Sequence, residues 1–233
     1  MAVLTGDIVS STSLSKEARS RLPDVLRQVG DDVREHFAAA GPSAIDVFRG
    51  DSWQLVLAQP AAALRITLYF HSRLHSMSTD EPLTSRTAIG IGNVDFIPPD
   101  SVSEGDGTAF RLSGKALEEM DRNRRLAIAV DDANASCECV ALPIILTLID
   151  ALTKRWTAKQ ARAVSGALRD MRQEQIAAEW HPAPITQQAI AQHLESAGWN
   201  AVDEAVAQFE QIIERLNPQS SDDRPLNTAS EHT

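Results

Sequence analysis

Cysteine and long apolar runs are both scarce in this chain. Its only two cysteines, Cys137 and Cys139, form a CxC pair without the further ligands nearby that a zinc site would need, so we read them as incidental thiols. The longest apolar run, residues 140–149, is too short to span a bilayer and contains Pro143. The first residues lack the charged and long apolar segments of a signal peptide. We therefore expect a soluble, cytoplasmic protein with no membrane partner.

Basic residues are also in the minority. The 233 residues include 22 Lys and Arg against 32 Asp and Glu, which gives a formal net charge of -10. This balance argues against an extended nucleic-acid or anionic-membrane footprint as the main activity. It does not exclude a small phosphate ligand, because a metal ion can supply the local positive charge.

The hydrophobic pattern predicts an α+β fold. The expected elements are, in chain order, a strand at 2–9, a helix at 15–40, strands at 45–48 and 53–57, a helix at 60–75, a strand at 84–91, a helix at 107–120 and a strand at 126–130. This β-α-β-β-α-β order, with one more α and β, predicts a ferredoxin-like domain over residues 1–135. Residues 136–216 are expected to form a small all-α domain and residues 217–233 a disordered tail.

Two Gly-Asp pairs occur where strands end. Asp7 follows the first strand, and Asp51 stands in the hairpin VFRGDSWQLVL. The predicted topology places the end of the first strand beside the tip of this hairpin, so the two carboxylates should meet. Paired carboxylates bind Mg²⁺ or Mn²⁺ and bridge them to phosphates. The alternative, that both pairs are ordinary turns, stays open.

Polar residues near these aspartates could contact a phosphate ligand. Ser10, Ser11 and Thr12 lie where a strand gives way to a helix, and backbone N–H groups there could cradle a triphosphate or simply cap the helix. Arg49 could point to the same side as Asp51 or pair with an acid. Asp106 could cap the helix that follows it or read a ligand base.

These motifs resemble those of a known superfamily. TGDIVSST followed by FRGDSWQLVL is similar to the paired metal-binding motifs of class III nucleotidyl cyclases and of palm-type nucleotide polymerases. The whole pattern, with EGDGTAFRLSGKALEEM and a helical C-terminal region, resembles the SatD family of bacterial proteins over about 200 residues. The resemblance implies a metal-dependent nucleoside triphosphate site that forms a cyclic nucleotide and pyrophosphate, shared across a homodimer.

The resemblance also assigns roles to individual residues. Asp7, the carbonyl of Ile8 and Asp51 correspond to the metal ligands. Arg111 and Lys115, one helical turn apart on one face, correspond to the catalytic Asn and Arg of the cyclases. Both can neutralise phosphate, but lysine lacks the planar fork of arginine, so the departure concerns cyclisation more than binding.

The C-terminal region contains a pattern typical of a helix-turn-helix, as SatD-like proteins do. In the second helix, Gln187, Gln188, Gln192 and His193 could face a DNA groove. From residue 151 onward, however, 8 basic residues oppose 11 acidic ones, a net charge of -3. The alternative to an enzyme is therefore a non-catalytic nucleotide sensor or DNA-binding regulator, and a dimerising helical domain fits this charge better than an operator reader.

The histidines suggest no site. Four of them show no spacing typical of metal ligands, namely His36, His71, His75 and His181, so the sequence assigns them no role.

Overall fold

The computed structural model describes residues 1–77, 83–99, 101–131, 133 and 136–216. The strands are β1 (Ala2–Ile8), β2 (Asp46–Phe48), β3 (Ser52–Leu57), β4 (Ser85–Ile91) and β5 (Leu126–Val130). The α-helices of this part of the chain are α1 (Lys16–His36), α2 (Ala63–Met77), α3 (Thr108–Glu118), α4 (Ala141–Thr153), α5 (Ala158–Ala167), α6 (Gln173–Ala178), α7 (Gln187–Ser196) and α8 (Trp199–Leu216). The predicted α+β class is confirmed.

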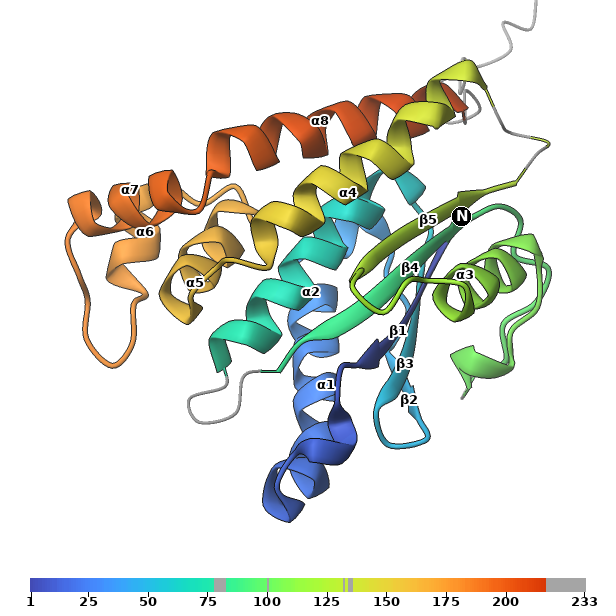
Figure 1. The fold of residues 1–233 in the computed structure, drawn as a ribbon, viewed down its shortest axis with the longest axis horizontal. Helices are drawn as coiled ribbons and strands as arrows, with labels where there is room; N and C mark the ends of the chain where they lie inside the picture. The colour runs from blue at the N-terminus through green and yellow to red at the C-terminus, as the bar shows by residue number, and fades with distance from the viewer. Residues whose placement is uncertain (78–82, 100, 132, 134–135, 217–233) are drawn as a thin grey trace, which may run out of the picture.

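The five strands form one mixed sheet in the order β2-β3-β1-β4-β5 (Figure 1). β1 lies in the middle and pairs antiparallel with β3 and with β4, whereas β4 and β5 run parallel. The register opposes Asp7 to Ser52 on one side and to Arg86 on the other. The strand that carries the first aspartate is thus held on both sides by main-chain hydrogen bonds.

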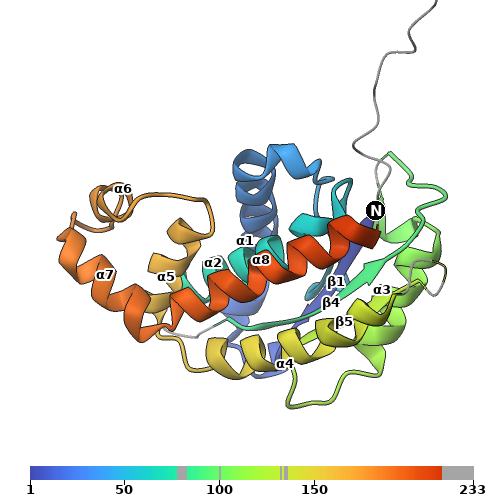
Figure 2. The same ribbon diagram turned by 90° about the horizontal axis from the view of Figure 1, so that it is seen from above.

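Each face of the sheet carries its own apolar cluster. Alternation along β1 sends Leu4 and Ile8 to the face covered by α1 and α2, and Val3 to the face covered by α3. Figure 2 shows α3 and α1 on opposite sides of the strands. β4 approaches α3 closely: a Cβ on Gly90 would lie 2.2 Å from the carbonyl oxygen of Ala109. Glycine is therefore required there for the helix to sit on the sheet.

The helices after β5 share a core with the sheet. One continuous cluster of buried side chains includes Leu26 of α1, Leu68 of α2, Leu146 of α4 and Phe209 of α8. Arg65 of α2 also donates to the Glu210 carboxylate of α8 at 2.7 Å.

The boundary at residue 135 stays a prediction, and the predicted tail, residues 217–233, lies outside the described residues. Among the described helices, none is long and apolar enough to cross a membrane.

Among the described histidines, His71 of α2 has the most strongly lowered pKa. Its Nε2 lies 2.8 Å from Thr87 Oγ1 on β4. Burial, with a smaller contribution from the charge of Arg125, lowers the pKa of His71 to about 3. The ring therefore stays neutral in the folded protein at pH values where it is protonated in the unfolded chain.

We predict a stability loss on acidification that His71→Gln removes. Below pH 6.5 the unfolded chain binds a proton at His71 that the folded chain does not, so stability falls as pH decreases toward 3. The wild type should lose up to about 1.4 kcal/mol per pH unit more than His71→Gln in this window. Urea denaturation of both proteins between pH 7 and pH 5 measures the difference. Parallel stability curves would contradict this assignment.

Candidate functional site

β1 ends in a turn that places four hydroxyl residues, Ser10 to Ser13, at one end of the sheet. Ser10 has a left-handed backbone with a φ of 55°, and a short 3-10 helix follows at Ser11–Ser13. The Ser13 N–H and hydroxyl both donate to the carbonyl oxygen of Ser10, at 2.9 and 2.7 Å. Ser15 then caps α1 by accepting from the Ala18 N–H. Local hydrogen bonds thus fix the turn beside Asp7.

The hairpin between β2 and β3 has a three-residue loop, Arg49 to Asp51, because Phe48 pairs with Ser52. Arg49 and Gly50 have positive φ values of 55° and 87°. The Gly-Asp pair therefore lies in the turn, as the turn interpretation predicts, although the loop has three residues rather than two.

Asp7 and Asp51 lie on adjacent chain segments at this end of the sheet, which we call the aspartate end. The Ile8 N–H donates to the carbonyl oxygen of Asp51 at 3.1 Å. Ser52, rather than Asp51, is directly opposite Asp7. The Asp51 carboxylate accepts from the Ser11 hydroxyl at 2.5 Å and, more weakly, from the Ser52 hydroxyl at 3.4 Å. The backbones therefore meet as the topology predicts, while the side chains have separate partners.

The Asp7 carboxylate is held by Arg86 of β4. Arg86 Nε donates to Asp7 Oδ1 at 2.9 Å and its Nη2 donates to Asp7 Oδ2, so both oxygens are engaged. The side chains are about equally shielded, with 25% of Asp7 and 26% of Arg86 exposed. The hydrogen bond to Asp7 holds the pKa of Arg86 above its usual range. Strand pairing causes this contact, because Arg86 is the direct cross-strand partner of Asp7.

This arrangement fits a cation only in part. Two carboxylates and the Ile8 carbonyl are hard oxygen donors of the kind that Mg²⁺ and Mn²⁺ prefer. Among the described residues, however, no group of three or more His, Cys, Asp or Glu side chains could hold a metal. Arg86 also occupies both oxygens of Asp7. The residues therefore fit one ion whose coordination is completed by water and ligand phosphates, provided that Arg86 releases Asp7. They do not fit a preformed two-ion site.

The other residues expected to contact phosphate differ in how exposed they are. Ser10, Thr12 and Arg49 are exposed, and Ser11 is partly buried because it bonds Asp51. A further cation, Arg19 of α1, donates to the carbonyl oxygen of Thr12 at 2.8 Å. The turn after β1 is thus flanked by positive charge that could face an anionic ligand.

The two cations expected to be catalytic lie at the opposite end of the sheet. α3 begins beside Asn93, whose carbonyl oxygen accepts from the Ala109 N–H at 3.0 Å, whereas Asp7 lies next to the start of β4. Arg111 and Lys115 line a small hollow with Val130 at the end of β5. Asp7 pairs with Arg86 and Val130 pairs with Ile91, so five residues of β4 separate the two levels, a span of roughly 17 Å. One chain therefore does not bring Arg111 and Lys115 to Asp7 and Asp51.

Asp106 is committed to local contacts at that far end. Its carboxylate accepts from the Gly107 N–H at 2.7 Å and from Arg111 Nη1 at 2.5 Å. Gly107 has a φ of 142° and is the residue before the first turn of α3. Asp106 thus orders the start of α3 and its arginine.

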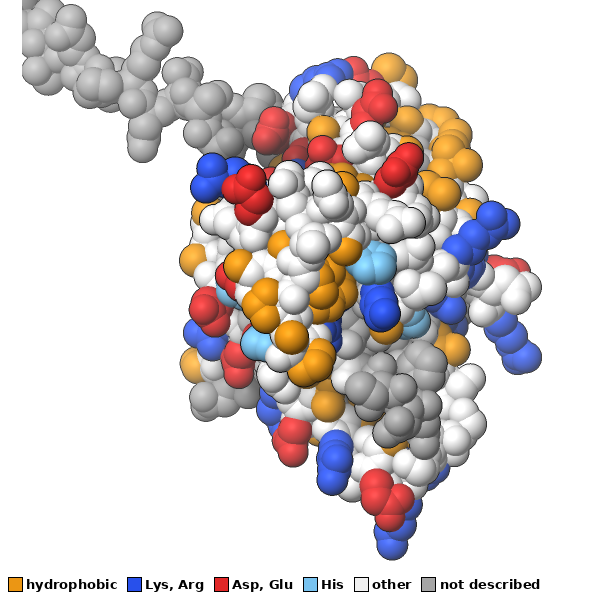
Figure 3. Space-filling view, turned by 90° about the vertical axis from the view of Figure 1, so that its left-hand side faces the viewer, with side chains coloured by type: hydrophobic (Ala, Val, Ile, Leu, Met, Phe, Trp, Pro, Cys, Tyr) orange, Lys and Arg blue, Asp and Glu red, His pale blue; other side chains and the backbone are white. Residues whose placement is uncertain are grey.

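Three of the four predicted DNA-reading residues are exposed and the fourth, His193, is half-buried. Gln187, Gln188 and Gln192 of α7 are exposed, but the His193 ring stacks on Trp180 with centroids 5.6 Å apart. Figure 3 shows the end of the molecule formed by α5 to α7, where basic and acidic side chains are interspersed over the described surface. This mixed charge gives little to attract a phosphate backbone.

The comparisons with known proteins identify no relative. No family model matches the chain, and no curated protein matches it.

Sequence reasoning missed Arg86 and Arg19, because each reaches the aspartate end through strand register or helix packing that no spacing rule reveals. The only signal was the placement of Arg86 near the start of an alternating strand.

We predict that Arg86→Ala destabilises the fold by about 1–3 kcal/mol, because it leaves the partly buried Asp7 carboxylate without its cation. The value lies below that of a fully buried pair because water still reaches both side chains. Urea denaturation at pH 7 measures the loss. Arg27→Ala, which breaks an exposed pair with Asp24 on α1, is the matched control and should change stability by about 0.5 kcal/mol or less. Equal effects of the two variants would show that the Asp7 contact is only a surface pair.

Proposed function

We propose that the aspartate end binds the phosphates of a nucleoside triphosphate together with one Mg²⁺ or Mn²⁺ ion. The observation that carries this proposal is the meeting of the β1 end and the β2–β3 hairpin, which brings Asp7, Ile8 and Asp51 together. Asp51, Asp7 and the Ile8 carbonyl would hold the ion, which would neutralise phosphate charge and polarise the reacting phosphorus.

The surrounding residues support a phosphate ligand. Ser11 orients the Asp51 carboxylate through a 2.5 Å hydrogen bond. Arg86, once it exchanges Asp7 for a ligand oxygen, keeps its full charge, because an arginine side chain stays protonated at neutral pH. The exposed Arg49 and Arg19 add positive charge beside the turn at Ser10 and Thr12.

The strand order supports the fold implied by this function. β4-β1-β3-β2 is the order of a ferredoxin-like sheet, to which β5 adds a parallel strand. We therefore propose a SatD-like, nucleotidyl cyclase-like domain. In the corresponding reaction the ribose 3′-hydroxyl attacks the α-phosphate, pyrophosphate leaves, and a cyclic nucleotide forms.

Catalysis by this chain would require two copies. Arg111 and Lys115 lie at the far end of the sheet from Asp7 and Asp51, so a second chain must supply them. We propose a homodimer in which the α3 face of one copy meets the aspartate end of the other. A non-catalytic nucleotide sensor needs no such exchange, which is the physical difference between the two candidate functions.

The binding proposal predicts a stabilisation that depends on both metal and nucleotide. Each of ATP, GTP, CTP and UTP is added with and without Mn²⁺, and the melting temperature of the full chain is measured. The nucleotide that binds should stabilise only with Mn²⁺ present, by about 2.7 kcal/mol at a concentration 100 times its Kd. Asp51→Asn should abolish the effect, whereas Asp24→Asn, an exposed carboxylate on α1, should retain it. An unchanged response in Asp51→Asn would refute the site.

The dimer proposal predicts complementation between two inactive variants. Asp51→Asn lacks one half of the site and Lys115→Ala the other, so each alone should release no pyrophosphate. Mixed in equal amounts, they should recover about a quarter of wild-type turnover, because half of the dimers then contain one intact site of two. Pyrophosphate release and cyclic product are the measured quantities. Metal-dependent binding without turnover in the wild type would instead favour the sensor.

A further inference from the structure

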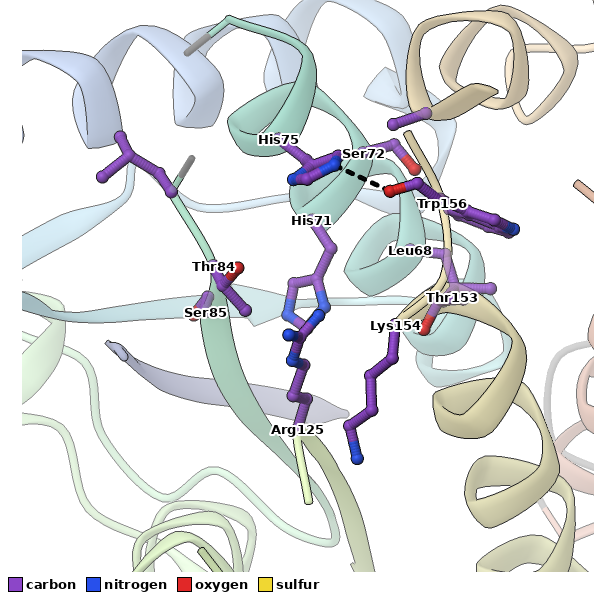
Figure 4. Close-up of a pocket in the computed structure, with 12 residues that line it drawn as sticks. Leu68, His71, Ser72, His75, Thr84, Ser85, Arg125, Thr153, Lys154 and Trp156 are labelled. Carbon is purple, nitrogen blue, oxygen red and sulfur yellow. Dashed lines mark hydrogen bonds between the residues drawn. The ribbon is translucent and has the colours of Figure 1, made fainter. Parts of the chain in front are cut away.

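A second pocket lies between the sheet and the C-terminal helices, on the face opposite α3. Its cavity volume is about 320 Å³, at the lower end of the range for small-molecule sites. Figure 4 shows that it is enclosed by α2, the start of β4, the segment before β5 and the connection from α4 to α5. None of the residues of the aspartate end lines it.

The lining of this pocket has an uncompensated positive charge. It includes the cations Arg125 and Lys154 and, among the described residues, no carboxylate. Lys154 is neutralised from outside the pocket, since its Nζ donates to Asp150 Oδ2 at 2.6 Å. Within the described part of the chain, the Arg125 guanidinium has no ion pair. Burial lowers the pKa of Arg125, and Asp150 only partly offsets this. An anion bound in the pocket would stabilise the charged guanidinium and offset this effect of burial.

The backbone places Arg125 firmly. Its carbonyl oxygen accepts from the Thr87 N–H of β4 at 2.8 Å, and its N–H donates to Asp150 Oδ2 of α4 at 3.2 Å. In Figure 4 the Arg125 side chain extends toward the His71 ring. His71 is already bonded to Thr87 and stays neutral, so it supplies no negative charge. The backbone that carries the guanidinium is therefore fixed at the pocket wall.

A buried hydroxyl in the same pocket has no partner. Ser72 of α2 is 1% exposed, and its Oγ makes no hydrogen bond with the described residues. Buried hydroxyls are almost always paired, because an unmade hydrogen bond costs about 1–3 kcal/mol. Its neighbour His75 is satisfied, since its Nε2 donates to the Trp156 carbonyl oxygen at 2.9 Å. Ser72 is thus the polar group that a ligand would complete.

The rest of the lining combines apolar side chains with the hydroxyl residues Thr84, Ser85 and Thr153. Four apolar residues, Leu68, Leu83, Trp156 and Ala161, form part of its walls. Trp156 is fixed by an indole hydrogen bond to the carbonyl oxygen of Ala197 at 2.8 Å, so its ring is a rigid surface. These walls favour a ligand with a compact apolar body over a bare inorganic ion.

We propose that this pocket binds a small organic acid, whose carboxylate pairs with Arg125, whose apolar body packs on Trp156 and Leu68, and which satisfies the Ser72 hydroxyl. A planar guanidinium and a carboxylate form two parallel hydrogen bonds, which selects a carboxylate over a neutral amide of the same shape. The site is separate from the proposed nucleotide site.

Benzoate is the probe, benzamide its neutral match and inorganic phosphate the competing anion. Titration of the full chain is followed by the indole N–H signals of the four tryptophans, of which Trp156 lines the pocket. Benzoate should shift the Trp156 signal and bind about 10- to 100-fold more tightly than benzamide. Because this comparison uses the unmodified chain, it decides the matter even if a variant fails to fold.

Two arginine variants locate the carboxylate. Arg125→Gln should weaken benzoate binding about 10- to 100-fold, while Arg122→Gln, exposed and three residues earlier, should leave it unchanged. Asp51→Asn should also bind benzoate normally, so failure of the nucleotide proposal would not affect this result. Equal binding of benzamide, an unaffected Arg125→Gln, no shift at Trp156, or displacement of benzoate by phosphate at equal concentration would each overturn the proposal.

Discussion

The ion pair between Arg86 and Asp7 is the interaction on which the candidate site depends. It links the two central strands at the position where the topology brings two carboxylates together, and it occupies both oxygens of one of them. A cation can use Asp7 only by exchanging with the guanidinium, which must then find another anion. A phosphate ligand provides that anion, so metal and nucleotide would bind together more readily than either alone. The same pair keeps the β1 end shielded when nothing is bound.

The strands and helices could be predicted largely from the sequence, because their apolar spacing is regular. The course of β1 and the helical positions of Leu22, Leu26 and Val33 in α1 follow that spacing into the core. The meeting of the β1 end with the Asp51 hairpin also followed from strand order. In contrast, the pairing of Asp7 with Arg86 depends on a register between β1 and β4 that a shift of one residue would have changed.

The predictions about individual site residues were incomplete where residues distant in the sequence determine the role of a side chain. The hairpin loop has three residues instead of two, and stacking on Trp180 leaves His193 only partly exposed. The histidines appeared without function because His71 and His75 sit four residues apart on α2 and show no ligand pattern. Their common pocket exists only because α4 and α5 fold back over that helix, a contact distant in the sequence.

Ser85 connects the two regions of interest through one hydroxyl group. It lines the organic-acid pocket, accepts from the Trp53 indole N–H at 3.1 Å, and its Oγ lies 2.9 Å from the Asp7 carbonyl oxygen. A residue that lines the organic-acid pocket thus also bonds the backbone of Asp7, a proposed metal ligand. A ligand that shifted the start of β4 would act on both places, and reciprocity would then give the same coupling factor in each direction.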